Sequence, residues 1–282
     1  MDSYVRDSFL PYFSQHIPLR NMANQVSLLA YLQHGPPRIP IIEQGQSTDN
    51  TTNTRYSADD ITYVGHWATF NLNTILHQHQ AVLTNSRRED EAMPLSPPQA
   101  INSEPGLRQR FSFYMNQRVR RALRSGFDFL TTNNQLANRT VVDFGEGNLA
   151  QLIEQFTPDT AYYDPLLPAP TRPNRVPGDL KPSFKWSLAL RNSPTPYGRK
   201  QFKQALAQVN YYMKQHEAHF GFILTDRELV AIRRLDRNGR LELSDSVPWI
   251  TKGSESQPRL TVLLALWYLG MLTSDNLQWH LP

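Results

Sequence analysis

The strongest constraint on the fold is the most apolar run of the chain, fourteen residues at 260–273 (LTVLLALWYLGMLT) without a charged side chain. A helix that spans a bilayer needs about twenty apolar residues, so this run is too short to cross a membrane. A helix that is apolar all round is instead buried in a protein core. We therefore expect a buried helix over 259–273, and the 39% hydrophobic content of the 282 residues suffices to build a core around it.

The absence of cysteine excludes several classes of site. Without cysteine there are no disulfides, thiolate nucleophiles, zinc ribbons or cysteine-ligated iron–sulfur clusters. Any metal must bind carboxylate oxygens or imidazoles. The first residues (MDSYVRDSFLPYFSQH) carry charges and lack the apolar stretch of a secretory signal. These features predict an intracellular protein, in the cytoplasm or nucleus, without a membrane segment.

Hydrophobic periodicity predicts an α/β fold. Helices are expected over 58–83, 107–125, 149–156 and 197–216, strands over 160–163 and 178–186, and two further strands with an Asn238-Gly239 hairpin within 220–244. Residues 1–106 are interpreted as helical decoration with flexible proline-rich loops, the loop at 84–106 being the most mobile and burying nothing. Residues 107–282 are interpreted as the core, which the helix at 259–273 closes.

One group of residues predicts chemistry. Pro158-Asp159 opens one expected strand, and Asp179-Leu180-Lys181 opens the next. Residues two apart on a strand point the same way, so Asp179 and Lys181 share a face. If Asp159 lies across from them, two carboxylates and an ammonium converge. Carboxylates are the ligands that Mg²⁺ or Mn²⁺ prefers, and the backbone carbonyl of Leu180 is a candidate further ligand.

These residues resemble the signature of the PD-(D/E)XK nuclease superfamily, which has the restriction-endonuclease-like fold. That signature is Pro-Asp, followed on the next strand by Asp or Glu, any residue and Lys; Pro158-Asp159 and Asp179-Leu180-Lys181 match it. The resemblance implies a central mixed sheet flanked by helices, with an extra helical region at the N-terminus. It also implies that Asp159 and Asp179 bind the metal and that Lys181 is the catalytic lysine.

A second element on the next expected helix supports this resemblance. Gln208 and Tyr212 fit the Gln-x-x-x-Tyr pattern of the RecB-like branch, in which both residues would face the substrate. The resemblance covers about 107–245. It departs from many active members in one respect, because the expected helix at 107–125 contains no acid, and Glu146 and Glu154 are only approximate substitutes. Pro182 also removes a backbone donor beside the site, which indicates a strand that is distorted or open on one side.

The arginines suggest a partner. Arg118 and Arg121 belong to a set on the helices and hairpin that could line a phosphate groove, namely Arg108, Arg110, Arg118, Arg120, Arg121, Arg124, Arg233, Arg234, Arg237 and Arg240. The net charge of only +4 also fits a solvated surface. The sequence thus favours divalent-metal-dependent phosphodiester hydrolysis of nucleic acid. Two alternatives stay open: a nuclease-like fold reused without metal on a small apolar metabolite, as an isomerase or cyclase, and a non-catalytic protein that binds nucleic acid or another partner.

Overall fold

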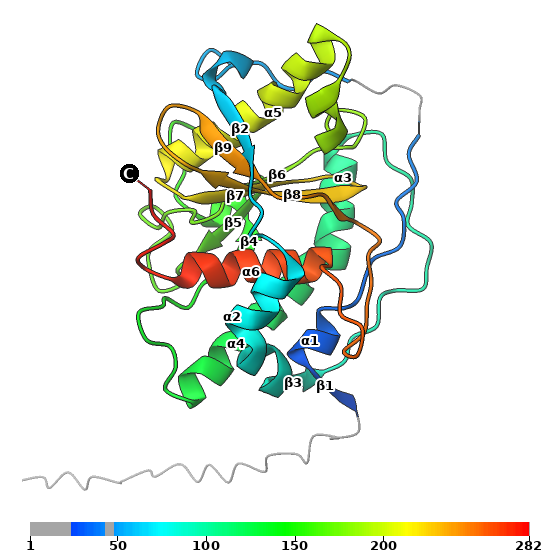
Figure 1. Ribbon diagram of the computed structural model, residues 1–282, viewed down its shortest axis with the longest axis vertical. Coiled ribbons are helices and arrows are strands. Elements are labelled where there is room, and N and C mark those ends of the chain that lie inside the picture. The colour runs from blue at the N-terminus through cyan, green and yellow to red at the C-terminus, as the bar shows by residue number, and fades with distance from the viewer. Residues whose placement is uncertain (1–23, 43–47, 282) are drawn as a thin grey trace, which may run out of the picture.

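A mixed sheet with helices on both faces forms the centre of the protein (Figure 1). The structure, a computed structural model, describes residues 24–42 and 48–281. In this part of the chain eight strands form the sheet, in the order β2-β9-β8-β7-β6-β5-β4 with β10 against β8. Their bounds are β2 (Tyr63–His66), β4 (Asp143–Glu146), β5 (Thr160–Tyr163), β6 (Gly178–Leu180), β7 (Phe220–Leu224), β8 (Glu228–Arg234), β9 (Arg240–Leu243) and β10 (Val247–Pro248). The expected α/β class is confirmed.

The pairing of β5, β6 and β7 brings the predicted site residues into the middle of the sheet. β6 pairs parallel with β7 and antiparallel with β5, so that Thr160 lies opposite Gly178 and Asp179 lies opposite Ile223. A Cβ on Gly178 would come within 2.3 Å of Thr160 Oγ1, so this close approach requires glycine. Asp159, immediately before β5, therefore lies beside β6.

The two faces of the sheet pack against different helices. Alternate residues of β7 point to opposite faces. Ile223 packs in the cluster that contains the apolar side of α5 (Pro196–Gln215), whereas Phe222 packs in the cluster that contains α6 (Val262–Ser274). α4 (Gln117–Thr132) contacts α6 and α2 (Leu72–Asn85), so α6 lies between the sheet and other helices. The buried helix expected over 259–273 is present.

A smaller unit lies beside α2 and α4. β1 (Gln25–Ser27) pairs antiparallel with β3 (Arg87–Glu89), and α1 (Leu28–Tyr31) follows β1 directly. The predicted mobile loop at 84–106 therefore contains a strand, and its Ile101 is a core residue with 2% exposure. The expectation that this segment buries nothing is wrong.

The helix predicted over 58–83 is wrong in its first half. The capping box of Ser57 and Asp60 forms, but it begins only a 3₁₀ turn, η2 (Ala58–Asp60). β2 then joins the sheet in parallel with β9. Pairing at the sheet edge thus outweighs an apolar spacing that also suits a helix. The helix begins at Leu72, where the Asn71 side chain caps it.

The helix predicted over 107–125 begins earlier, ends later and is interrupted. α3 (Glu104–Phe111) is capped by Ser103 and has a proline in its first turn. A π-helical turn, η3 (Ser112–Asn116), joins α3 to α4. The earlier start matters for function, because it adds an acidic residue, Glu104, to the first turn of the helix. The helix predicted over 107–125 contains no acid.

Three shorter predictions also need correction. Residues 149–156 do not form a helix; only the 3₁₀ turn η4 (Gly147–Leu149) is present, and Glu154 and Gln155 have positive φ angles. The strand predicted over 178–186 ends at Leu180, two residues before Pro182. Residues 220–244 hold three strands rather than two, with Gly239 (φ +76°) in the last turn. The strand at 160–163 and the helix at 197–216 are confirmed as β5 and α5.

The division into two regions at residue 106 stays a prediction, although β2 from the first region is a strand of the central sheet. Residues 1–23 of the expected helical decoration lie outside the described residues. None of the helices that the structure describes is long and apolar enough to cross a membrane.

Candidate functional site

Asp179 and Lys181 form a buried ion pair at the end of β6. Lys181 Nζ lies 2.9 Å from Asp179 Oδ2. The exposed fraction is 4% for Asp179 and 1% for Lys181. The two side chains meet because residues two apart on a strand point to the same face. The pair predicted from the sequence is therefore formed, but behind the protein surface.

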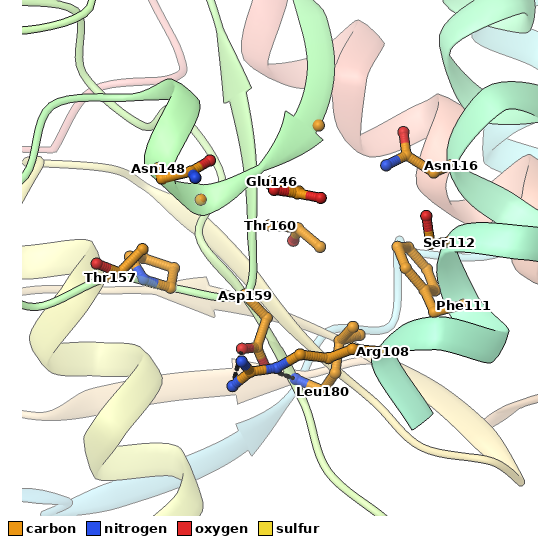
Figure 2. A pocket seen from close by; sticks show the side chains of 13 residues that line it. Arg108, Phe111, Ser112, Asn116, Glu146, Asn148, Thr157, Asp159, Thr160 and Leu180 are labelled. Atoms are coloured by element: carbon orange, nitrogen blue, oxygen red, sulfur yellow. Dashed lines mark hydrogen bonds and ion pairs between the residues drawn. The ribbon is translucent and has the colours of Figure 1, made fainter. Parts of the chain in front are cut away.

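Asp159 lies beside this pair and carries its own contacts. Its Oδ2 accepts a 2.7 Å hydrogen bond from the backbone N–H of Leu180, and its Oδ1 lies 2.5 Å from Arg108 Nη2. Figure 2 shows both contacts, with Arg108 reaching from α3. The Asp159 side chain is only 5% exposed, whereas that of Arg108 is 53% exposed. The structure thus brings together Asp159, Leu180 and the β6 pair, and adds an arginine.

Burial and a like charge disturb the ionisation of Asp159. Burial is the largest cause and the charge of Asp179 the next, and together they raise the pKa of Asp159 to about 7, against the lowering effects of Arg108 and the Leu180 N–H. Two carboxylates at this depth repel each other when both are ionised. Ionisation of both is therefore unfavourable unless positive charge compensates them, which Lys181 and Arg108 provide in this structure.

Lys181 is held in its charged form. Burial alone would lower its pKa, but the carboxylates of Asp179, Glu104 and Asp159 outweigh burial and raise the pKa of Lys181 above its ordinary value. An ammonium with a raised pKa does not take a proton from water at neutral pH. It can donate hydrogen bonds and offset negative charge.

Glu104 is a functional candidate that is not among the site residues predicted from the sequence. Its Oε1 lies 3.1 Å from Lys185 Nζ and 3.9 Å from Lys181 Nζ. Its position in the first turn of α3 aims it at the end of β6. The signal was the run Ser103-Glu104-Pro105, because an N-cap residue shortly before a proline marks a helix start. Glu146 and Glu154, the approximate substitutes for an acid on this helix, form no ion pair with Lys181 in the part of the chain that the structure describes.

The Gln-x-x-x-Tyr residues of α5 lie against the same group. Gln208 Nε2 donates a 2.9 Å hydrogen bond to the hydroxyl of Tyr212, which is 5% exposed. Burial raises the pKa of Tyr212, and the charge of Asp179 adds to this. Tyr56 is also buried, and burial raises its pKa, with Lys181 and Asp179 among its charged neighbours. Nothing in the sequence around Tyr56 signalled this position.

A cavity of about 350 Å³ opens on the Asp159 side of this group. It is lined by Arg108, Phe111, Ser112, Asn116, Gly145, Glu146, Gly147, Asn148, Thr157, Pro158, Asp159, Thr160 and Leu180. Asp159 and Leu180 thus reach the cavity, whereas Asp179 and Lys181 lie behind its lining. In Figure 2 the cavity lies between α3 and η3 on one side and the turn after β4 on the other.

The arginines singled out as substrate contacts do not line this cavity. The guanidinium of Arg118 is buried and donates to the carbonyls of Tyr114 and Ala92. Arg121 pairs with Glu91 and lines a separate hollow with Arg88. Arg118 donates to backbone carbonyls at the packed side of the helix, so its role at the substrate stays a prediction that this geometry does not support. The arginine that reaches the carboxylates is Arg108.

The donor atoms suit a hard cation. Within the described ranges, no group of three or more His, Asp or Glu side chains is placed to hold a metal ion. The charge of Asp179 acts on Asp159, so the two carboxylates belong to one group. Asp179 Oδ2 is buried and accepts no aligned hydrogen bond, although Lys181 Nζ lies 2.9 Å away. Oxygen ligands completed by a backbone carbonyl, such as that of Leu180, and by waters fit Mg²⁺ or Mn²⁺. The residues present therefore fit such an ion.

Comparison with known proteins gives no relative. No family model, curated protein or solved structure matches the chain. The function is therefore inferred from the geometry of the site and from the sequence motifs.

Proposed function

We propose that the protein hydrolyses phosphodiester bonds of nucleic acid with a divalent metal ion, on a core of the PD-(D/E)XK nuclease type. One observation carries this proposal. Two mutually repelling carboxylates, Asp159 and Asp179, stand on neighbouring strands of a mixed sheet beside the Lys181 ammonium. The order of strand, strand and following helix α5 agrees with the resemblance found in the sequence.

Asp159 and Asp179 would hold Mg²⁺ or Mn²⁺, together with the carbonyl of Leu180 and waters. The bound ion would supply a polarised phosphate and a water of lowered pKa. The pair of carboxylates must be ionised to bind it, and the raised pKa of Asp159 shows that the protein alone stabilises that state poorly. Metal binding would therefore favour the ionised form of Asp159, and the ionised carboxylates would in turn be needed to bind the metal.

Lys181 acts in this scheme as a fixed positive charge. Because its pKa is raised, it stays protonated and can offset the negative charge that develops on the phosphate. Glu104, between Lys181 and Lys185, keeps two ammonium groups near each other without strong repulsion. Glu104 is thus a positioning residue for Lys181.

Arg108 has a double role. In the structure it neutralises Asp159 at 2.5 Å, but its side chain is half exposed and borders the cavity. The guanidinium has five N–H donors and its contact with Asp159 uses Nη2, so its other donors can face the cavity with or without a bound cation. There it can bind a phosphate oxygen, because its planar donors suit phosphate. Arg108 would thus hold the substrate backbone.

The test is cleavage of plasmid and of labelled single-stranded oligonucleotides by the purified protein with Mn²⁺ or Mg²⁺. We expect cleavage that stops with EDTA and is lost in Asp159→Asn. Asp128→Asn, which changes an exposed carboxylate of α4, is the matched control and should cleave normally. Absence of metal-dependent cleavage on both substrates, or full activity of Asp159→Asn, would remove the proposal.

A second candidate is nucleic-acid binding without hydrolysis. It is favoured by one observation, the near-complete burial of Asp179 and Lys181 as a mutual ion pair. If this is the function, the protein binds oligonucleotides with an affinity that falls steeply with salt and shows no turnover with any divalent metal. The cleavage assay separates the two candidates.

A further inference from the structure

We propose that the cavity beside Asp159 is a nucleoside subsite, which binds the base and sugar of one unstacked nucleotide of a single strand next to a phosphate held by Arg108. This inference rests on the proposed function, because it names the part of the nucleic acid that the site takes. It concerns side chains that neither hold the metal nor follow from the family resemblance.

Polar side chains on opposite walls of the cavity come from separate elements. Ser112 and Asn116 stand on η3, while Glu146 and Asn148 stand opposite, around the turn that follows β4 (Figure 2). Thr160, at the start of β5, lies between the two walls in the same view. Hydroxyl, amide and carboxylate groups therefore border one space, as in sites that orient a small polar ligand.

Two of these groups have unmet hydrogen-bonding capacity. Among the described residues, Asn116 Oδ1 and Thr160 Oγ1 are buried atoms without a hydrogen-bond partner, and Thr160 is only 3% exposed. A buried polar atom without a partner is costly, and native proteins place such atoms where water or a ligand supplies the bond. Both residues line the same cavity, which indicates one ligand site rather than two unrelated defects.

The backbone at one wall is also unusual. η3 is a π-helical turn between two α-helices, and it carries both Ser112 and Asn116. π-helical turns are rare and occur frequently at functional sites. Phe111, just before η3, supplies a buried apolar part of the same lining. The helix is thus distorted at the point where it borders the cavity.

The charges give the orientation of the ligand. Arg108 attracts a phosphate beside Asp159, whereas the exposed carboxylate of Glu146 borders the cavity and would repel a second phosphate. Glu146 instead favours groups with N–H or O–H donors. Amino groups of cytosine or adenine and the hydroxyls of the sugar are such donors. The cavity therefore suits an uncharged nucleoside with its phosphate at the Arg108 end.

The size limits the occupant to one nucleotide. A volume of about 350 Å³ lies at the small end of ligand pockets, which span roughly 300–1,000 Å³. A stacked duplex does not enter such a space, but an unstacked nucleotide does, as in enzymes that extrude a base. We therefore infer that the substrate is single-stranded, or locally unpaired, at the position next to Asp159.

The test measures binding in EDTA, so that it needs neither metal nor turnover. Isothermal titration with cytidine 5′-monophosphate, ribose 5-phosphate and inorganic phosphate compares base, sugar and phosphate. We expect the nucleotide to bind at least about tenfold more tightly than ribose 5-phosphate, since the site's polar groups lose their partners when the base is missing. Equal affinity for the three ligands would overturn the subsite.

Variants locate the binding. Asn116→Leu removes an amide from the wall and should weaken the binding of cytidine 5′-monophosphate at least about fivefold, but not that of inorganic phosphate. Asn73→Leu, on an exposed position of α2, is the control and should leave both affinities unchanged. Thermal melts verify that each variant is folded, and Asn116→Ser replaces Asn116→Leu if the leucine variant is not. Unchanged nucleotide binding by the folded Asn116 variant would overturn the proposal.

The outcome separates the subsite from the proposed function. Nucleotide-selective binding in EDTA, without cleavage under any metal, supports the subsite and removes only the hydrolytic function. Metal-dependent cleavage without nucleotide selectivity, and with duplex cut as fast as single strand, supports the function and removes only the subsite.

Discussion

Arg108 Nη2 lies 2.5 Å from Asp159 Oδ1. A half-exposed arginine therefore neutralises a carboxylate whose side chain is only 5% exposed. The same carboxylate accepts the Leu180 N–H through its other oxygen. Arg108 thus takes the place that a cation bound to Asp159 would take. The guanidinium and a metal ion compete for one carboxylate, and this competition can be measured.

Replacing Arg108 by Met should separate the two roles assigned to it. Mn²⁺ affinity should rise about three- to tenfold, because the ion no longer displaces a guanidinium in this partly exposed site. Affinity for an oligonucleotide in EDTA should fall, with a salt dependence weaker by about one phosphate contact. Isothermal titration and fluorescence anisotropy measure the two effects. The control is Arg124→Met, which changes an exposed arginine of α4 and should leave the Mn²⁺ affinity unchanged. A fall in Mn²⁺ affinity for Arg108→Met would contradict the competition.

Asp159→Asn should stabilise the protein at pH 8 while it abolishes cleavage. The pKa of Asp159 is about 7 in the folded protein and about 3.9 in an unfolded chain. Between these values the folded state binds more protons, so this group lowers stability as pH rises from about 4 to 7. Asparagine removes the penalty.

The measurement is the difference in melting temperature between Asp159→Asn and the unsubstituted protein. We expect it to be small at pH 5 and to grow through pH 8, in EDTA. The opposite result is a difference in melting temperature, variant minus unsubstituted protein, that is lower at pH 8 than at pH 5. It would show that the Arg108 and Leu180 contacts outweigh the repulsion from Asp179.

The central sheet could be predicted only in part, because its strands differ in how much local signal they carry. β5 and the helix α5 follow from apolar periodicity and were predicted at nearly their observed bounds. β2 was hidden, because Val64 and its neighbours also fit a helical spacing and only the partner strand β9 decides between the two. Long-range pairing of this kind has no local signature.

The site shows the same limit. Asp179 and Lys181 were predicted to meet because they are two apart in an extended segment, a local relationship that the sequence contains. Arg108 and Glu104 reach the site from α3. The packing of α3 against β6 is a tertiary contact that the local sequence does not indicate. Arg118 shows the same limit from the other side: its charge suggests a phosphate contact, whereas in the structure its guanidinium donates to backbone carbonyls.

Glu104→Gln should weaken both stability and activity. The carboxylate lies 3.1 Å from Lys185 Nζ and 3.9 Å from Lys181 Nζ, and its side chain is 22% exposed. Its loss leaves Lys181 with less compensation, which we expect to cost about 1–3 kcal/mol of unfolding free energy. Urea unfolding measures this cost.

The effect of Glu104→Gln on catalysis distinguishes a positioning role from a purely structural one. If Glu104 positions Lys181, kcat falls and KM stays nearly constant at a temperature where the variant is fully folded. Glu255→Gln, an exposed acid in the loop before α6, should change neither quantity. An unchanged kcat in Glu104→Gln would assign Glu104 to the fold alone.

His216 should make the protein less stable in acid. It is 4% exposed, its Nδ1 accepts a hydrogen bond from the Asn174 N–H, and burial lowers its pKa to about 4. An unfolded histidine has a pKa of about 6.5, so between pH 6.5 and 4 the unfolded state binds more protons and stability falls as pH falls. Asp159 acts in the opposite direction over this window, which would mask the effect in the unsubstituted protein.

The effect of His216 is therefore best measured in the Asp159→Asn background. Urea unfolding at pH 7, 5.5 and 4.5 should show a decline in stability that is shallower when His216→Leu is added, although leucine lowers stability at pH 7 because Asn174 loses its acceptor. His77→Leu, an exposed histidine of α2, should leave the slope unchanged. An equal slope with and without His216 would mean that its imidazole has the same pKa in the folded and unfolded protein, which would contradict the lowering of its pKa by burial.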